Sequence, residues 1–145
     1  MNEAMHHIRK KIYNLLDGGV SLGGSDVPVY NRVPTNAAHP YIWIYSVSTN
    51  EIDQNATSYN MECITRIECV TRFSGDQGGD LNANQLVNSC LSLLRTRSSG
   101  YFNLTSDGFS VYTSTVESVN YLQEDAEDNT YFKGIIELSN RVEQI

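Results

Sequence analysis

Cysteine is scarce in this sequence, and its spacing excludes the sites that cysteines usually build. The 145 residues include three cysteines, Cys63, Cys69 and Cys90, and no CxxC pair. An odd count at this spacing is not typical of a disulfide framework or a zinc site. Cys63 and Cys69 fall on one predicted strand, where their separation spans roughly 20 Å, so they cannot bridge each other. We expect three buried thiols that act as small apolar side chains.

Long apolar runs and clustered cations are also missing. No run approaches the ~20 apolar residues of a membrane-spanning helix, and residues 1–11 lack the hydrophobic stretch of a signal peptide. Lysine and arginine total 10 against 17 acidic residues, which gives a formal net charge of −7. Nucleic acids and anionic membranes both require clustered basic residues. The sequence therefore predicts a protein that stays in a cytoplasm and binds neither partner unassisted.

The remaining composition and the helical patterns predict one α+β domain over residues 1–145. This length is close to the commonest size for a single domain, and 40% of the residues are hydrophobic. Apolar residues spaced by three and four predict a helix over residues 2–16, with Asn2 as its N-cap and Asp17 at its end. A second helix is expected to be capped by Asp80 or Asn82 and to end at residues 98–100.

β-Branched and alternating residues predict four longer strands, over residues 41–47, 59–73, 109–122 and 130–142. A shorter extended piece is expected at residues 27–33, a loop at 21–26 and a polar bridge at 48–58. The last two strands are expected to form a hairpin. Short links favour antiparallel neighbours, so we expect a two-layer sandwich of one mostly antiparallel sheet packed by two helices.

The two faces differ in chemistry in two of these predicted strands. Over residues 59–73, one face carries Tyr59, Met61, Cys63, Ile67, Cys69 and Phe73. The opposite face carries Glu62, Arg66, Glu68 and Arg72, with Ile64 and Val70 as apolar exceptions. These mixed charges suit either a specific wet interface or the exposed face of an ordinary sheet. Over residues 109–122, alternation assigns Val116 to the face opposite Phe109, Val111, Val119 and Tyr121.

The length of the predicted strands is unusual. Three of them run 12 to 15 residues in the sequence, whereas globular strands are usually about 5–6 residues long. A strand of 15 residues reaches roughly 50 Å, which exceeds the width of a domain of this size. Such a strand must project, bend or pair with another chain. We therefore expect long projecting hairpins.

No catalytic or cofactor motif is present. His6 and His7 are neighbours on a helix and face different directions, so exposed residues explain them better than a metal site does. His39 precedes a proline, and no nucleophile is marked by a turn motif, which leaves a hydrolase built on His39 and a carboxylate as a distant alternative. The glycine pairs do not match phosphate-binding loops. We predict a non-enzymatic protein without cofactor or metal.

Two loops carry clusters of acidic residues. Asp76 and Asp80 lie in one loop, and Glu124, Asp125, Glu127 and Asp128 lie in the other. Together they offer oxygen ligands for calcium, but their spacing does not match the EF-hand, and solvated turns explain the same charges. With Glu62, Arg66, Glu68 and Arg72, they form the candidate interface with other protein subunits.

The order of these signals carries a family resemblance. It comprises the opening helix, the segment Val29-Tyr30-Asn31-Arg32-Val33-Pro34, the strand His39-Pro40-Tyr41-Ile42-Trp43-Ile44, a long strand ending in Arg72-Phe73-Ser74-Gly75, a helix over residues 84–94 and a closing hairpin. In this order the chain resembles the tail-terminator and minor-tail proteins of long-tailed bacteriophages, a family of small α+β ring-forming subunits. The likeness covers nearly the whole chain and lies in pattern rather than in fixed residues.

The resemblance implies a structural virion protein of the tail or neck, assembled in the bacterial host cytoplasm. Its partners would be copies of itself in a homo-hexameric ring, the tail tube protein and the head-completion or connector protein. Such a ring docks on the last ring of the tube, stops its growth, and lets DNA pass without specific binding. Another ring of the neck, a tail-tube component and a monomeric binding module are the alternatives.

Overall fold

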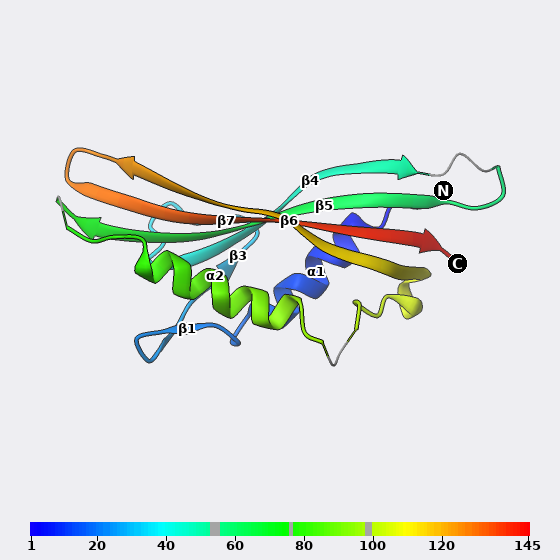
Figure 1. The fold of residues 1–145 in the computed structure, drawn as a ribbon, viewed down its shortest axis with the longest axis horizontal. Coiled ribbons are helices and arrows are strands. Elements are labelled where there is room, and N and C mark those ends of the chain that lie inside the picture. The colour runs from blue at the N-terminus through cyan, green and yellow to red at the C-terminus, as the bar shows by residue number, and fades with distance from the viewer. Residues whose placement is uncertain (53–55, 76, 98–99) are drawn as a thin grey trace.

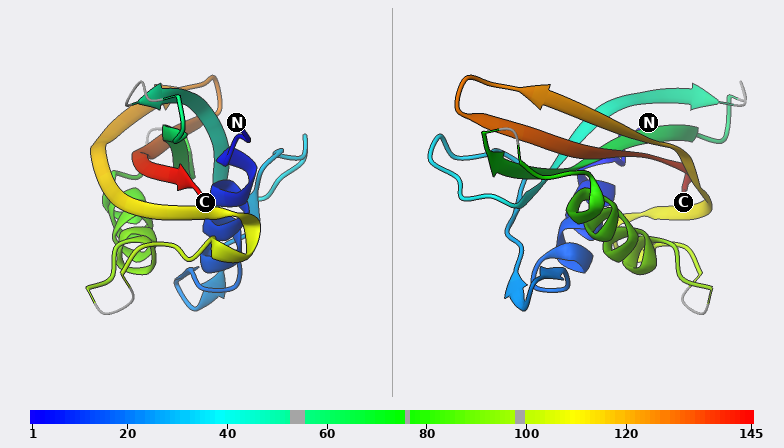
Figure 2. Two further views of the ribbon diagram at one scale, coloured as in Figure 1. Left: turned by 90° about the vertical axis from the view of Figure 1, so that its right-hand side faces the viewer. Right: turned by 60° about the vertical axis from the view of Figure 1, so that its left-hand side comes forward.

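The computed structural model describes residues 1–52, 56–75, 77–97 and 100–145, and it confirms the α+β class (Figure 1). These residues form two α-helices, one short 3-10 helix and two β-sheets, and the larger sheet is mostly antiparallel. Both α-helices lie on the same side of the larger sheet, as the views in Figure 2 show. None of the described helices has the length and apolar character needed to cross a membrane.

Helix α1 runs from Met5 to Leu16 and packs as its spacing predicts. Its buried residues recur every three or four positions: Met5, Ile8, Ile12 and Leu16. The predicted Asn2 cap is wrong, because the N-cap position is Ala4, without a side-chain hydrogen bond. The backbone N–H of Asn2 instead donates to Oε1 of Gln144, 2.7 Å away. The first N–H of the helix is satisfied locally, because the N–H of Met5 donates to Oε1 of Glu3.

Helix α2 runs from Leu81 to Leu94 and ends earlier than predicted. Asp80, one of the two predicted capping residues, occupies the N-cap position, although its side chain makes no capping hydrogen bond. The short 3-10 helix η1, Thr105–Asp107, then precedes the second half of the sheet. Residues 98 and 99, part of the predicted helix end, lie outside the described residues.

The larger sheet has the strand order β3-β4-β5-β7-β6. Its strands are β3 Val29–Tyr30, β4 Tyr41–Ile52, β5 Asn60–Ser74, β6 Phe109–Asp125 and β7 Asn129–Gln144. Neighbouring strands pair antiparallel, except that β3 pairs parallel to β4. A separate ribbon of β1 Ser21–Leu22 and β2 Ser25–Asp26 occupies the segment predicted as a loop.

Strand β4 corrects the prediction of a polar bridge over residues 48–58. The strand continues to Ile52, and Ser48 lies opposite Ile64 after a register shift at residues 46–48. Hydrogen bonding to β5 outweighs the low strand propensity of this polar segment, because propensity in sheets depends on the neighbouring strand. Residues 53–55 of the predicted bridge lie outside the described residues.

Strand β6 corrects the predicted position of Val116. Register shifts at residues 111–113 and 116–118 each add one residue to β6 relative to β7. Each added residue reverses the alternation, so Val116 lies opposite Leu138 and packs against the core, as do Val111 and Val119. Alternation alone could not locate these two irregularities.

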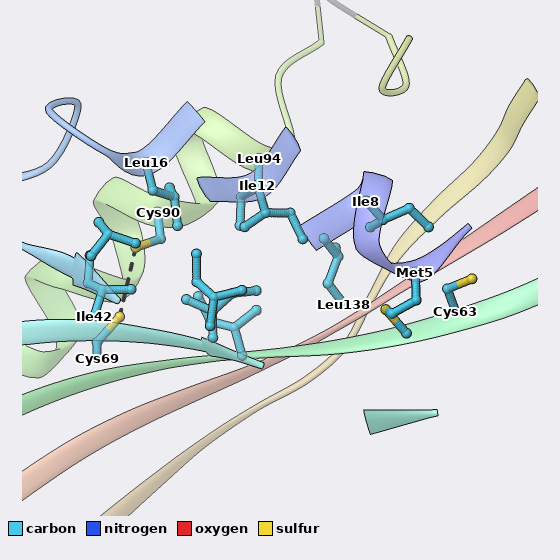
Figure 3. Packing of buried hydrophobic residues seen from close by; sticks show 14 of the residues in the cluster. Met5, Ile8, Ile12, Leu16, Ile42, Cys63, Cys69, Cys90, Leu94 and Leu138 are labelled. Carbon is cyan, nitrogen blue, oxygen red and sulfur yellow. Dashed lines mark hydrogen bonds between the residues drawn. The ribbon is translucent and has the colours of Figure 1, made fainter. Parts of the chain in front are cut away.

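The core lies between the helices and the sheet (Figure 3). Strand β5 contributes the odd-numbered residues of the predicted apolar face, among them Met61, Cys63, Ile67 and Cys69, all without exposed surface. All three cysteines are free and buried, which confirms their predicted role as core residues. Helix α2 crosses β7 at Gly134, where a Cβ atom would lie 2.4 Å from Cγ2 of Val87.

Candidate assembly interface

The outer face of β5, away from the helices, carries the predicted charged residues, and two of them pair within the chain. Nε of Arg66 lies 3.2 Å from Oε2 of Glu137, and Nε of Arg141 lies 3.2 Å from Oε2 of Glu62. Both pairs join residues that face each other across β5 and β7. Arg66 and Glu62 are therefore already paired with charged residues on β7 of the same chain.

Glu68 is buried, at 7% exposed, and so is not the open charge that alternation suggests. The Tyr45 hydroxyl on β4 donates to Oε2 of Glu68 across 2.5 Å. Burial, and secondly this hydrogen bond, raise the pKa of Tyr45 above its usual value. The buried outer-face Val70 lies one position further along the same face. The middle of the outer face is therefore partly covered by aromatic side chains.

His39 lies beside aromatic rings at the entrance to β4. Its ring centroid is 4.9 Å from that of Tyr41 and 5.5 Å from that of Tyr131. Burial lowers the pKa of His39, and the positive charges of Arg72 and Lys133 lower it further. Within the described residues, the buried Nδ1 atom of His39 has no hydrogen-bond partner. These neighbours favour a neutral imidazole.

The two acidic loops meet at one end of the sheet. The N–H of Gly75 donates to the carbonyl of Asp128, and Thr130 Oγ1 donates to the carbonyl of Gly75. Asp80 and Asp125 line one pocket of about 480 Å³. Among the residues that the structure describes, no three His, Cys, Asp or Glu side chains are grouped to hold a metal ion. Asp76 itself lies outside the described residues.

The turn between β6 and β7 presents two carboxylates to solvent. Glu124 pairs with Lys133, whose Nζ lies 3.2 Å from Oε2, and Asp125 accepts a hydrogen bond from Gln123. The side chains of Glu127 and Asp128 are exposed, and the described part of the chain provides them with no ion pair. Of the acidic turn, these two charges remain open to another molecule.

A groove between α2 and β6 was not predicted from the sequence. It measures about 580 Å³ and is lined by Leu91, Ser92, Arg95, Ser114, Thr115 and Val116. The Ser114 hydroxyl is buried and has no hydrogen-bond partner among the described residues. Its cross-strand neighbour Asn140, which has no exposed surface, likewise lacks a partner for both side-chain amide atoms. The sequence feature that could have indicated this groove is Asn140, a polar residue that interrupts the alternating apolar residues of β7.

No family model matches this chain. No curated protein matches it either.

One edge of the larger sheet is strand β6, with 17 residues, and the other edge is the two-residue β3 beside β4. One side of β6 pairs with β7 along nearly its whole length. On its other side, no strand of the described residues is paired with it. Such an edge presents backbone N–H and C=O groups that another strand can bind. The edge and the groove adjoin, because Ser114, Thr115 and Val116 belong to β6.

Proposed function

We propose that this chain is a structural subunit of a bacteriophage tail, a tail terminator that assembles into a closed homo-hexameric ring. The observation that supports this most is the long open edge of β6. A free edge of 17 residues is an aggregation hazard unless another element covers it. Pairing with a neighbouring copy would cover the edge and use its backbone groups for assembly.

Closed symmetry explains how such a subunit would stop tube growth. When each copy is rotated by a fixed angle relative to the last and the ring closes, no lateral edge remains free. The two axial faces of the ring differ, so one face would bind the tail tube and the other the head-completion or connector protein. The net charge of −7 suits a DNA channel, because acidic walls repel the passing phosphates.

The finer architecture belongs to this proposal. We regard the chain as a two-layer sandwich in which the β6–β7 hairpin projects past the helices, toward the left in Figure 1. A projecting hairpin would allow a ring subunit to contact its neighbour. The interface would combine that hairpin with the β6 edge.

The mass in solution is the direct test. We expect light scattering to give about six times the chain mass of 16.2 kDa, and negative-stain images to show rings. Replacing residues 123–129 by a two-residue Asn-Gly turn should lower the assembled mass and keep the far-UV circular dichroism. A mass of one chain at all concentrations would favour the monomeric binding module instead.

Added tail tubes separate the remaining alternatives. A tail terminator should bind at one tube end and prevent the addition of further tube subunits. A tail-tube component should itself extend into open tubes, since its rings stack. A different neck ring should bind connector proteins and leave tube growth unchanged.

A further inference from the structure

We propose that the groove between α2 and β6 receives the acidic β6–β7 turn of a second copy of this chain, with Arg95 pairing to Glu127 or Asp128. This inference rests on the proposed ring assembly and specifies its contact. The contact joins the exposed Arg95 guanidinium of one copy to the exposed carboxylates of Glu127 and Asp128 on the next.

The groove has the chemistry to bind a carboxylate-bearing turn. Arg95 follows the last residue of α2, is exposed, and has no ion pair within the described part of the chain. Guanidinium groups bind carboxylates with two parallel hydrogen bonds. Leu91 and Val116 add apolar walls that would pack against the stem of an inserted side chain.

Polar groups beneath the groove favour an occupant that can form hydrogen bonds. The Ser114 hydroxyl lies in the groove lining and the Asn140 amide lies opposite it on β7, and neither has a hydrogen-bond partner among the described residues. A buried polar group without a partner costs free energy until it gains one. Rotation of Ser114 about χ1 moves its hydroxyl to another staggered position, from which it can donate to an oxygen in the groove.

The chain cannot insert its own turn into its own groove. Asp125 lies eleven residues beyond Ser114 on β6, which corresponds to roughly 35 Å of extended strand. Pairing with β7 keeps this length of β6 extended, with a single register shift at residues 116–118, so the turn stays far from the groove. In Figure 1 the turn lies at one end of the long axis, and α2 runs away from it toward its C-terminal end.

This separation also determines the symmetry of the contact. The turn and the groove are different surfaces, so their contact is heterologous, from the head of one copy to the tail of the next. A heterologous contact generates a ring when its rotation closes. The proposed contact therefore produces a ring when its rotation closes, and an open filament when it does not.

Charge reversal tests the contact. The variants are Arg95→Glu, the double variant Glu127→Arg with Asp128→Arg, and the combination of all three substitutions. Each reversal alone should raise the dissociation constant of assembly at least about tenfold, and the combination should restore assembly close to wild type. Arg32→Glu is the matched control, because Arg32 is exposed and lies outside the groove.

Analytical ultracentrifugation at low salt measures the dissociation constant of assembly for every variant, and circular dichroism verifies that each variant is folded. Rescue by the combination, with assembly of Arg32→Glu unchanged, supports the contact. Single reversals that assemble like wild type, or a combination that stays dissociated, overturn the contact but leave the ring standing. A wild-type chain that remains monomeric overturns the ring and the contact together.

Discussion

The Sγ atoms of Cys69 and Cys90 lie 3.8 Å apart and join the buried face of β5 to α2 (Figure 3). Their mutual hydrogen bond, followed by burial, raises the pKa of Cys69 well above its ordinary value. The thiolate is the reactive form of cysteine, so a raised pKa makes the residue inert. The pair thus belongs to the packing between sheet and helix.

We predict that the cysteines resist alkylation in the folded protein. All three are buried, and burial also raises the pKa of Cys63 to about 11. Iodoacetamide at neutral pH should label the native chain at least about a hundredfold more slowly than the urea-unfolded chain. Intact mass spectrometry over time measures both rates. Equal rates would show that the core opens freely.

Alkaline pH should destabilise the fold, and Cys63 should contribute. Its pKa rises from 9.0 to about 11 on folding, so the folded state keeps its proton where the unfolded state has lost it. The contribution of Cys63 is complete below pH 9.0 and is lost as the pH rises toward about 11. Urea titrations from neutral pH to pH 11 should show a shallower fall for Cys63→Ala than for wild type. A stability that rises over this range would contradict the assignment.

Gly134→Ala should destabilise the chain where α2 crosses β7. The added methyl would lie 2.4 Å from Cγ2 of Val87, so the helix must move away from the strand. We expect a loss of about 1–3 kcal/mol in the free energy of unfolding, measured in urea. Adding Val87→Ala should recover part of it. Gly79→Ala is the control, because a methyl group added there would meet no atom within 4 Å.

Tyr45→Phe should reveal the contribution of the half-buried Tyr45–Glu68 hydrogen bond on the outer face. The substitution leaves the Glu68 carboxylate without its donor on β4 while the ring is retained. The free energy of unfolding should fall by about 1–3 kcal/mol. Tyr13→Phe on the exposed face of α1 should change it by less than about 0.5 kcal/mol. Similar losses for both variants would mean that the Tyr45–Glu68 bond adds little.

Local patterns in the sequence predicted the elements that repeat regularly. The spacing of Met5, Ile8 and Ile12 identified α1, and strict alternation identified the buried face of β5. These patterns are readable because helical and strand periods are properties of consecutive residues. The α+β class and the antiparallel pairing follow from the same patterns and the short links.

Contacts between distant residues decided the rest. Glu68 is buried beside Tyr45, which β4 brings next to it, and Val116 faces the core because β6 shifts register against β7 at residues 111–113. The groove likewise combines Arg95 from the end of α2 with Ser114 from β6. The sequence by itself determined the helical and strand periods of its apolar residues, the acidic turn and the lack of clustered cations. Tertiary structure alone decided which charges are paired and which edge stays open, because pairing and burial depend on residues that are far apart in the chain.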